Sequence, residues 1–94
     1  MKLNFNLYCE KGAIIIVDYI MQKNCGLVVI GRVKNEDVFV GEMVAIKNDA
    51  RDAIFDKIKR IEIDGEKVIN ANEGQLCGIC LDTISKEDLI KYFE

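Results

Sequence analysis

Two cysteines, Cys77 and Cys80, are separated by two residues in the stretch QLCGICLD, residues 75–82. A C-x-x-C spacing occurs in redox-active dithiols and in one half of many zinc sites. On a β-strand, however, residues three apart point to opposite faces, and their Cα atoms lie about 10 Å apart at a rise of about 3.3 Å per residue. A disulfide spans at most roughly 7 Å between Cα atoms, so these cysteines cannot pair if the stretch is a strand.

The other residue types argue against catalysis and metal binding. Cys9 and Cys25 are too scattered to complete a zinc frame of two C-x-x-C pairs. The sequence has no histidine, no G-x-x-x-x-G-K-[ST] loop and no G-x-G-x-x-G turn, which removes the commonest bases, metal ligands and phosphate cradles. We therefore expect a protein that is not an enzyme, holds no cofactor or metal, and keeps its four thiols reduced.

The composition indicates one globular domain. Apolar residues make up 50% of the 94 residues, which is enough to form a core across residues 1–94. The 13 Lys and Arg residues against 16 Asp and Glu give a net charge of -3, so any attraction to phosphate must be local. The apolar runs are short and no basic segment leads into a long one, so we expect a cytoplasmic protein with no membrane partner.

Most of the chain has the short alternating or β-branched segments of β-strands. LNFNLYC, residues 3–9, alternates apolar and polar side chains, as expected when one strand face is buried. The further expected strands are the hairpin of IIIVDYIM (14–21) and GLVVIGRV (26–33), then VFVGEMVAI (38–46) broken at Gly41, IKRIEI (58–63) and QLCGICLD. With turn residues between them, these strands predict an all-β fold, either a small antiparallel barrel or a sandwich.

Residues 50–58 fit no single element. Ala50, Ile54, Ile58 and Ile61 recur at helical spacing, and Asp49 could cap such a helix. KNDARD, residues 47–52, instead has the composition of a loop. Helix, loop and strand therefore all remain open for this segment.

The C-terminal SKEDLIKYFE, residues 85–94, predicts a short helix. Ser85 is a favourable N-cap, and the acidic Glu87 and Asp88 lie in the first turn, where the helix dipole favours negative charge.

Two long stretches resemble a known family. GLVVIGRVKNEDVFVGEMVAI, residues 26–46, is similar to the opening half of the second domain of elongation factor Tu and related translational GTPases, where G-x-V-V-x-G-R-V leads by a tight turn into V-G-E-x-V-x-I. IEIDGEKVINANEGQLCGICLDTISKEDL, residues 61–89, resembles the stretch from the family's V-E-M strand through A-G-x-x-V-G-L-L-L to its K-R-E-D-I turn. IVDYI occupies the place of the family's I-E-D-V-F strand, so the resemblance covers residues 14–89.

The resemblance implies a stand-alone, small antiparallel β-barrel with a short C-terminal helix. C-G-I-C falls on the family's buried V-G-L-L strand, so Cys77 and Cys80 would each replace an apolar side chain. In the family this barrel carries no catalysis and holds the aminoacylated end of transfer RNA in a shallow pocket. The resemblance therefore implies a binding module for an RNA end, a nucleotide-like ligand or a translation component, without GTP binding. The alternative is a protein-interaction or oligomerisation module with no nucleic-acid role, such as a homodimer through a sheet edge.

The resemblance also implies candidate binding residues. Glu62 matches the family's glutamate on which the terminal adenine lies. Gly31 and Arg32 match the neighbouring G-R pair, and Ile79 stands at an aliphatic position. Gln22 and Asn24 belong to the stretch that replaces the family's I-S-G-R-G turn beside the pocket. The full set is Glu62, Gly31, Arg32, Ile79, Gln22 and Asn24. Each has a plainer interpretation: charged residues on strands usually form solvated pairs, and glycines in small barrels usually permit bends.

The resemblance leaves one place in the barrel to be filled. The family continues after its E-D-I turn into a last strand, which SKEDLIKYFE does not provide. Residues 1–13 form an extra N-terminal segment, and KLNFNLYC, residues 2–9, has the pattern of a half-buried strand. We expect this strand to close the barrel with LIKYF as a helix over one end, the alternative being a second chain at the same edge.

Overall fold

The computed structural model describes residues 4–48 and 51–93. These residues form mainly strands, followed by a C-terminal helix. The elements are β1 (Asn6–Cys9), β2 (Ile14–Lys23), β3 (Gly26–Lys34), β4 (Val38–Phe39), β5 (Met43–Asn48), β6 (Arg51–Ile63), β7 (Glu66–Val68), β8 (Asn70–Ala71), β9 (Leu76–Leu81) and α1 (Lys86–Phe93).

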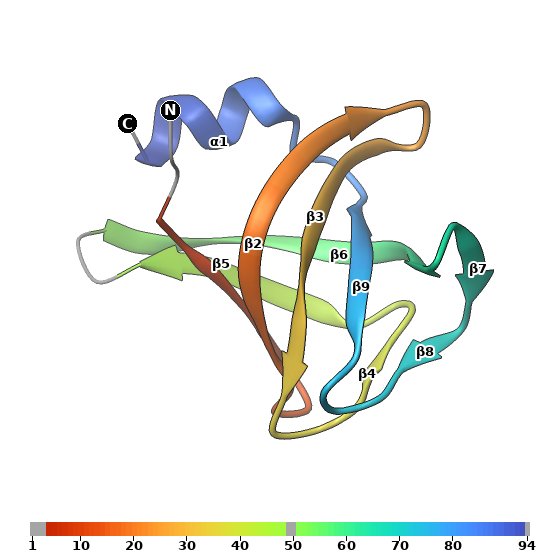
Figure 1. The fold of residues 1–94 in the computed structure, drawn as a ribbon. Coiled ribbons are helices and arrows are strands. Elements are labelled where there is room, and N and C mark those ends of the chain that lie inside the picture. The colour runs from red at the N-terminus through yellow and green to blue at the C-terminus, as the bar shows by residue number, and fades with distance from the viewer. Residues whose placement is uncertain (1–3, 49–50, 94) are drawn as a thin grey trace.

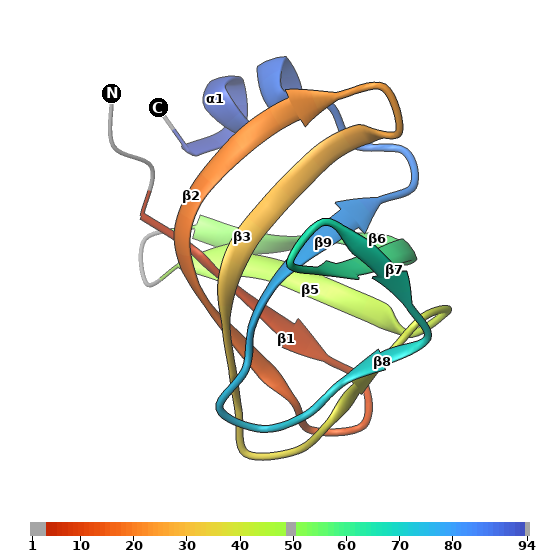
Figure 2. The ribbon, with the colours of Figure 1, turned by 45° about the vertical axis from the view of Figure 1, so that its right-hand side comes forward.

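The strands close into an antiparallel barrel (Figure 1). Among the described residues, six strands pair in the order β5-β1-β2-β3-β9-β6, and β6 pairs again with β5 to complete the ring. β7 extends the sheet beyond β6, while β4 and β8 form a separate two-stranded ribbon near the barrel end away from α1 (Figure 2). The predicted fold, a small antiparallel barrel with a short C-terminal helix, is confirmed.

β1 is the strand that closes the barrel. Leu7 pairs with Ile15 of β2 on one side and with Ile46 of β5 on the other. The expectation that the N-terminal strand completes the barrel is therefore confirmed for residues 6–9. Asn4 and Phe5 precede the strand, and Lys2 and Leu3 lie outside the described residues.

α1 begins with the cap that the sequence predicts and covers one end of the barrel. The Asp88 N–H donates to Ser85 Oγ at 3.1 Å, and the Ser85 N–H donates to Asp88 Oδ2 at 3.1 Å, which is a reciprocal capping box. Leu89 is fully buried, and the Phe93 ring stacks on Phe5 with the centroids 5.2 Å apart. Glu94 lies outside the described residues, and no helix in the described ranges has the length and apolar character to cross a bilayer.

Residues 51–63 form one long strand, so the helical interpretation of this segment is wrong where the structure describes it. Ile58 and Ile61 both face the core although they are three residues apart. The register of β6 against β9 shifts between Ile58 and Arg60, a bulge that returns Ile61 to the inner face. This bulge produces the three-residue step from Ile58 to Ile61, which contributes to the helix-like spacing of the segment. Of the expected loop at residues 47–52, residues 47–48 end β5, residues 51–52 begin β6, and residues 49–50 lie outside the described ranges.

Candidate functional site

The candidate site lies on the outer face of the barrel, where β2, β3, β9 and β6 run side by side. The strand register places Tyr19 beside Ile30, Ile30 beside Gly78, and Gly78 beside Glu62. Cross-strand partners project to the same face, so these residues form one row across four strands. Gly78 contributes no side chain to the row, and the side chains of Ile30 and Val28 lie over it instead. We call this apolar strip beside the carboxylate of Glu62 the Gly78 shelf.

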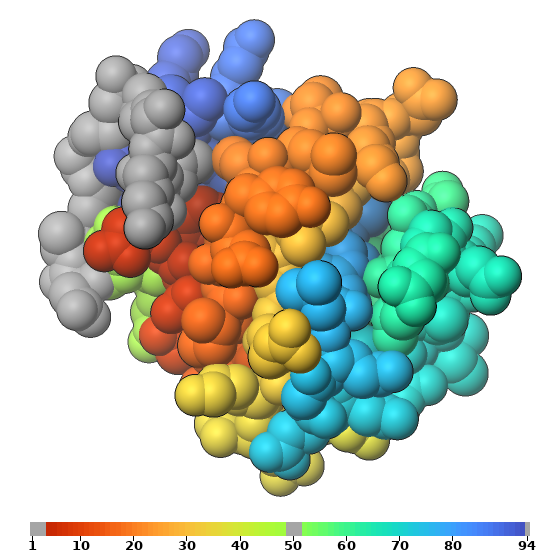
Figure 3. Space-filling view, viewed as in Figure 1, coloured from red at the N-terminus to blue at the C-terminus, as the bar shows by residue number. Residues whose placement is uncertain are grey.

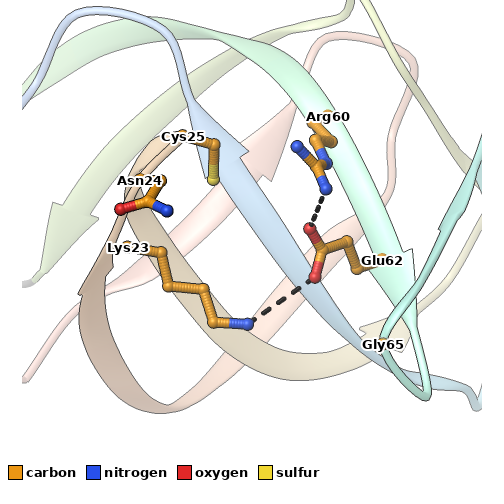
Figure 4. Close-up of a pocket in the computed structure, with 6 residues that line it drawn as sticks. All are labelled: Lys23, Asn24, Cys25, Arg60, Glu62 and Gly65. Carbon is orange, nitrogen blue, oxygen red and sulfur yellow. Dashed lines mark ion pairs between the residues drawn. The ribbon is translucent and has the colours of Figure 1, made fainter.

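Two adjoining hollows open on this face, and together we call them the Glu62 groove. The first has a volume of about 220 Å³ and lies over the shelf, where Tyr19, Val28, Ile30 and Gly78 contribute to its lining. The second has a volume of about 530 Å³ and is lined by Lys23, Asn24, Cys25, Arg60, Glu62 and Gly65 (Figure 4). Lys23, Glu62 and Gly65 line both hollows, which places them at the junction. Figure 3 shows the surface hollowed between the β2–β3 hairpin, in orange, and the region of β7, in green.

Glu62 is held in place by two cations. Its side chain is 14% exposed; Oε2 lies 2.9 Å from Arg60 Nη2 and Oε1 lies 3.7 Å from Lys23 Nζ (Figure 4). Because a different cation contacts each oxygen, the carboxylate has little freedom to rotate. Arg60 Nε is buried without a hydrogen-bond acceptor among the described residues, and such an unsatisfied donor typically costs about 1–3 kcal/mol.

The floor of the shelf is apolar because two aliphatic side chains lean over Gly78. A Cβ added to Gly78 would lie 3.2 Å from Ile30 Cδ1 and 3.2 Å from Val28 Cγ1, tighter than normal van der Waals contact. A larger residue would therefore displace both side chains and raise the floor. Glycine at this position therefore allows Val28 and Ile30 to form the apolar floor of the smaller hollow.

Two predicted binding residues, Glu62 and Asn24, line the groove. Gln22 lies near α1 instead, where its Oε1 accepts a hydrogen bond of 3.4 Å from the Lys86 N–H. Arg32 lies on the outer face but outside both hollows, and its Nη1 donates to the Gly74 carbonyl at 2.7 Å.

Ile79 and Gly31 face the interior of the barrel. Ile79 is fully buried in the core cluster. A Cβ on Gly31 would lie 2.5 Å from the Ile16 carbonyl oxygen and 2.8 Å from Ile15 Cγ2, so the glycine permits the close approach of β2 to β3. The structure therefore does not bring these two residues into the groove.

Several groove residues were absent from the predicted set. Lys23 follows directly after Gln22, but only the paired β2–β3 geometry shows that it reaches Glu62. Tyr19 lies on the outer face beside Ile30 because the β2–β3 register shifts between Val17 and Tyr19. Without this shift, strict alternation from Ile15 would have placed Tyr19 inside the barrel. Arg60 could have been predicted from the sequence, because it lies two residues before Glu62 and residues two apart on a strand share a face.

The four cysteines have unequal environments. Cys77 belongs to the core cluster, whereas Cys80 is buried on the outer side, where its thiol donates to the Cys25 carbonyl at 3.2 Å. The two side chains of the C-x-x-C thus point to opposite faces, as the strand spacing predicts. Burial raises the pKa of Cys77 to about 11 and, with nearby Glu42 as a smaller cause, that of Cys9 to about 12. At neutral pH these two thiols are protonated and behave as small apolar groups.

The described residues contain no group of three or more His, Cys, Asp or Glu side chains arranged to hold a metal ion. Comparison of the chain with models of known protein families gives no match, and a search of curated proteins gives no significant match. The function must therefore be argued from the groove and from the sequence motifs of the barrel.

Proposed function

We propose that the protein is a non-catalytic binding module whose Glu62 groove holds the planar end group of an RNA or of a nucleotide-like ligand. The observation that carries the proposal is the position of Glu62, fixed by Arg60 and Lys23 beside the Gly78 shelf. Glu62 is also the residue that matches the adenine-contacting glutamate of the second domain of elongation factor Tu. A translation component that carries such an end group is the expected partner.

The groove has the chemistry that a nucleobase requires. A base has two flat apolar faces and a polar edge, and the shelf offers Val28 and Ile30 as an apolar floor. Tyr19, which is 56% exposed, offers an aromatic face beside it. The Glu62 carboxylate can accept a hydrogen bond from an exocyclic amino group or a ribose hydroxyl, and Lys23 can contact a phosphate. Stacking of one base on an aromatic side chain contributes about 1–3 kcal/mol, so the expected binding is weak and favoured by longer RNA.

The test is a titration of the protein with a short single-stranded RNA that ends in a 3′ adenosine. Glu62→Gln removes the charge at nearly constant shape, and Tyr19→Ala removes the aromatic face. Each variant should weaken binding about tenfold, which corresponds to about 1.4 kcal/mol. Phe55→Ala removes an even more exposed aromatic residue, at 66% exposure, from another face and should leave the affinity unchanged.

The salt dependence of the RNA affinity provides a second test, measured by the same titration. Contact with phosphate through Lys23 predicts that the affinity falls as salt concentration rises. Absence of binding to any RNA, or equal affinities for the wild type and both groove variants, would refute the proposal.

A protein-interaction module is the second candidate. The outer face of β1, β5 and β6 exposes Phe55 at 66% and Met43 at 43%, and Tyr8 and Ala45 lie in the same cross-strand row as Phe55. Exposed apolar clusters of this kind favour protein contacts. The sheet also ends at β7, which offers an edge for pairing with a second copy. This candidate predicts a molar mass that rises with protein concentration and falls again in Phe55→Ser, measured by sedimentation equilibrium.

A further inference from the structure

The turn between β2 and β3 lies directly against β9. The Cys80 thiol donates to the Cys25 carbonyl at 3.2 Å, and a Cβ on Gly26 would lie 3.5 Å from the Leu81 carbonyl oxygen. Figure 4 shows the Cys25 side chain extending over β9, the strand that carries Cys80. Two cysteines that are 55 positions apart in sequence are thus brought together by the fold.

The two thiols differ in access. Cys25 is half-buried and lines the larger hollow of the Glu62 groove, so a small molecule in the groove can reach it. Cys80 is 2% exposed beneath the turn. Burial raises the pKa of Cys80 to about 12, its hydrogen bond with Cys25 and the neighbouring Cys25 thiol add to the increase, and Lys59 and Arg60 oppose it. The difference in access suits an accessible attacking thiol and a shielded second thiol, whereas the raised pKa of Cys80 slows the second step, because only a thiolate attacks.

We propose that Cys25 and Cys80 form a thiol pair that reacts with low-molecular-weight disulfides. Cys25 attacks the small disulfide, and Cys80 then displaces the bound group from Cys25. The Cys25 thiol loses its proton to water, and the thiolate attacks one sulfur of a disulfide R–S–S–R. A Cys25–S–S–R bond forms, the R–S–S–R bond breaks, and the released thiolate takes up a proton. Cys80 then loses its proton and attacks the Cys25 sulfur, which forms the Cys25–Cys80 disulfide and releases the second R–SH. The protein is oxidised by two electrons and the small disulfide is reduced to two thiols.

The fold excludes the other pairings that the sequence suggests. Cys77 faces the core from the opposite side of β9, so it cannot reach the turn without unfolding of the strand. The Cys25–Cys80 bond would instead fix the turn that carries Lys23 and Asn24 over the groove, since both residues precede Cys25 directly. Oxidation should therefore stiffen the groove and raise the thermal stability of the barrel.

The test uses the reduced 94-residue chain incubated with oxidised glutathione, followed by intact mass and then by alkylation and peptide mapping. The wild type should lose the mass of two hydrogen atoms, carry no glutathione and yield a cross-linked Cys25–Cys80 peptide. Cys80→Ser should retain one glutathione on Cys25, whereas Cys25→Ser should take up none under native conditions. Cys77→Val, which keeps this core position apolar, is the matched control and should behave as the wild type.

A second measurement covers the case in which Cys80→Ser folds poorly. Cys80→Ala is then compared, and the melting temperature of the wild type is measured before and after oxidation, with Cys25→Ser as the variant that should show no increase. A wild type that keeps glutathione on Cys25, or a cross-link that joins Cys77 or Cys9 instead, would overturn the proposal. Because these readouts involve no RNA, their outcome is independent of the proposed function of the groove.

Discussion

At the scale of single residues, one heavily hydrogen-bonded carboxylate in the described part of the barrel is not one that the sequence singled out. Asp56 is 4% exposed, and its carboxylate accepts hydrogen bonds from four donors: the Ile84 N–H and Lys57 N–H at 2.8 Å and the Thr83 N–H and Oγ1 at 3.1 Å. These bonds tie β6 to the segment that connects β9 with α1. Asp56 therefore fixes the direction in which the chain leaves the barrel.

Substitution of Asp56 by Asn should destabilise the protein by about 2–3 kcal/mol. The amide group keeps the size of the carboxylate, but its NH₂ would face buried donors and leave at least one unsatisfied, and hydrogen bonds to a charged acceptor are among the stronger ones. Chemical denaturation measures the loss. Asp52→Asn, an exposed position on the same strand, is the control and should change stability little. Equal effects of the two substitutions would mean that the network around Asp56 contributes no net stability.

The buried thiols predict a particular dependence of stability on pH. The pKa of Cys77 is raised from 9.0 to about 11 by burial, so the folded protein retains this proton more tightly than the unfolded chain. The resulting stabilisation is complete below pH 9 and is lost as the pH rises towards about 11. Urea denaturation in a reducing buffer from about pH 8 to about pH 10 should thus show a smaller decline for Cys77→Val than for the wild type. Val29→Ala, which weakens the same core but keeps every thiol, should decline like the wild type.

At the scale of elements, the strands were predictable where the side-chain period is regular and not where a bulge interrupts it. The hairpin of residues 14–33 and the last strand follow from β-branched runs and turn residues. The beginning of β6 was not predictable, because Ala50, Ile54 and Ile58 are four apart, a spacing that suits a helix and a strand alike. The bulge between Ile58 and Arg60 then adds the three-residue step to Ile61. The same limit applies to the groove, since its residues come together through the register of four strands and through the shift in β2 after Val17. Glu62 was predicted from a sequence motif and Asn24 from its place in the turn beside the expected pocket, whereas Tyr19 and Lys23 required the pairing itself.

Deletion of residues 1–10 should lower the melting temperature and promote association. β1 pairs with both β2 and β5, and Phe5 and Leu7 are buried, so its removal opens the barrel and exposes two strand edges. Calorimetry and light scattering measure the two effects. The point variant Leu7→Asn should reproduce the loss of stability, while Tyr8→Ser, on the outer face of the same strand, should cause a smaller one. A monomeric truncated protein of unchanged stability would show that β1 does not close the barrel in solution.

At the scale of the whole molecule, the barrel separates two outer surfaces with different chemistry. The Glu62 groove on β2, β3, β9 and β6 combines a fixed carboxylate, a lysine and an apolar shelf. The face of β1, β5 and β6 carries the exposed Phe55 and Met43. The proposed nucleotide-like ligand would use the first surface, and the alternative protein partner would use the second. The two proposed functions therefore predict contacts on different sides of one barrel.

The most direct measurement is a titration of isotope-labelled protein with an RNA that ends in a 3′ adenosine, followed through the backbone amide resonances. Binding in the groove predicts that the largest shifts lie at Tyr19, Ile30, Gly78 and Glu62, and that the same titration with Glu62→Gln requires about tenfold more RNA. The amides of Tyr8, Ala45 and Phe55 should remain unchanged. A spectrum without shifts, or with shifts centred on Phe55, would contradict the account of the groove as a nucleotide-binding site.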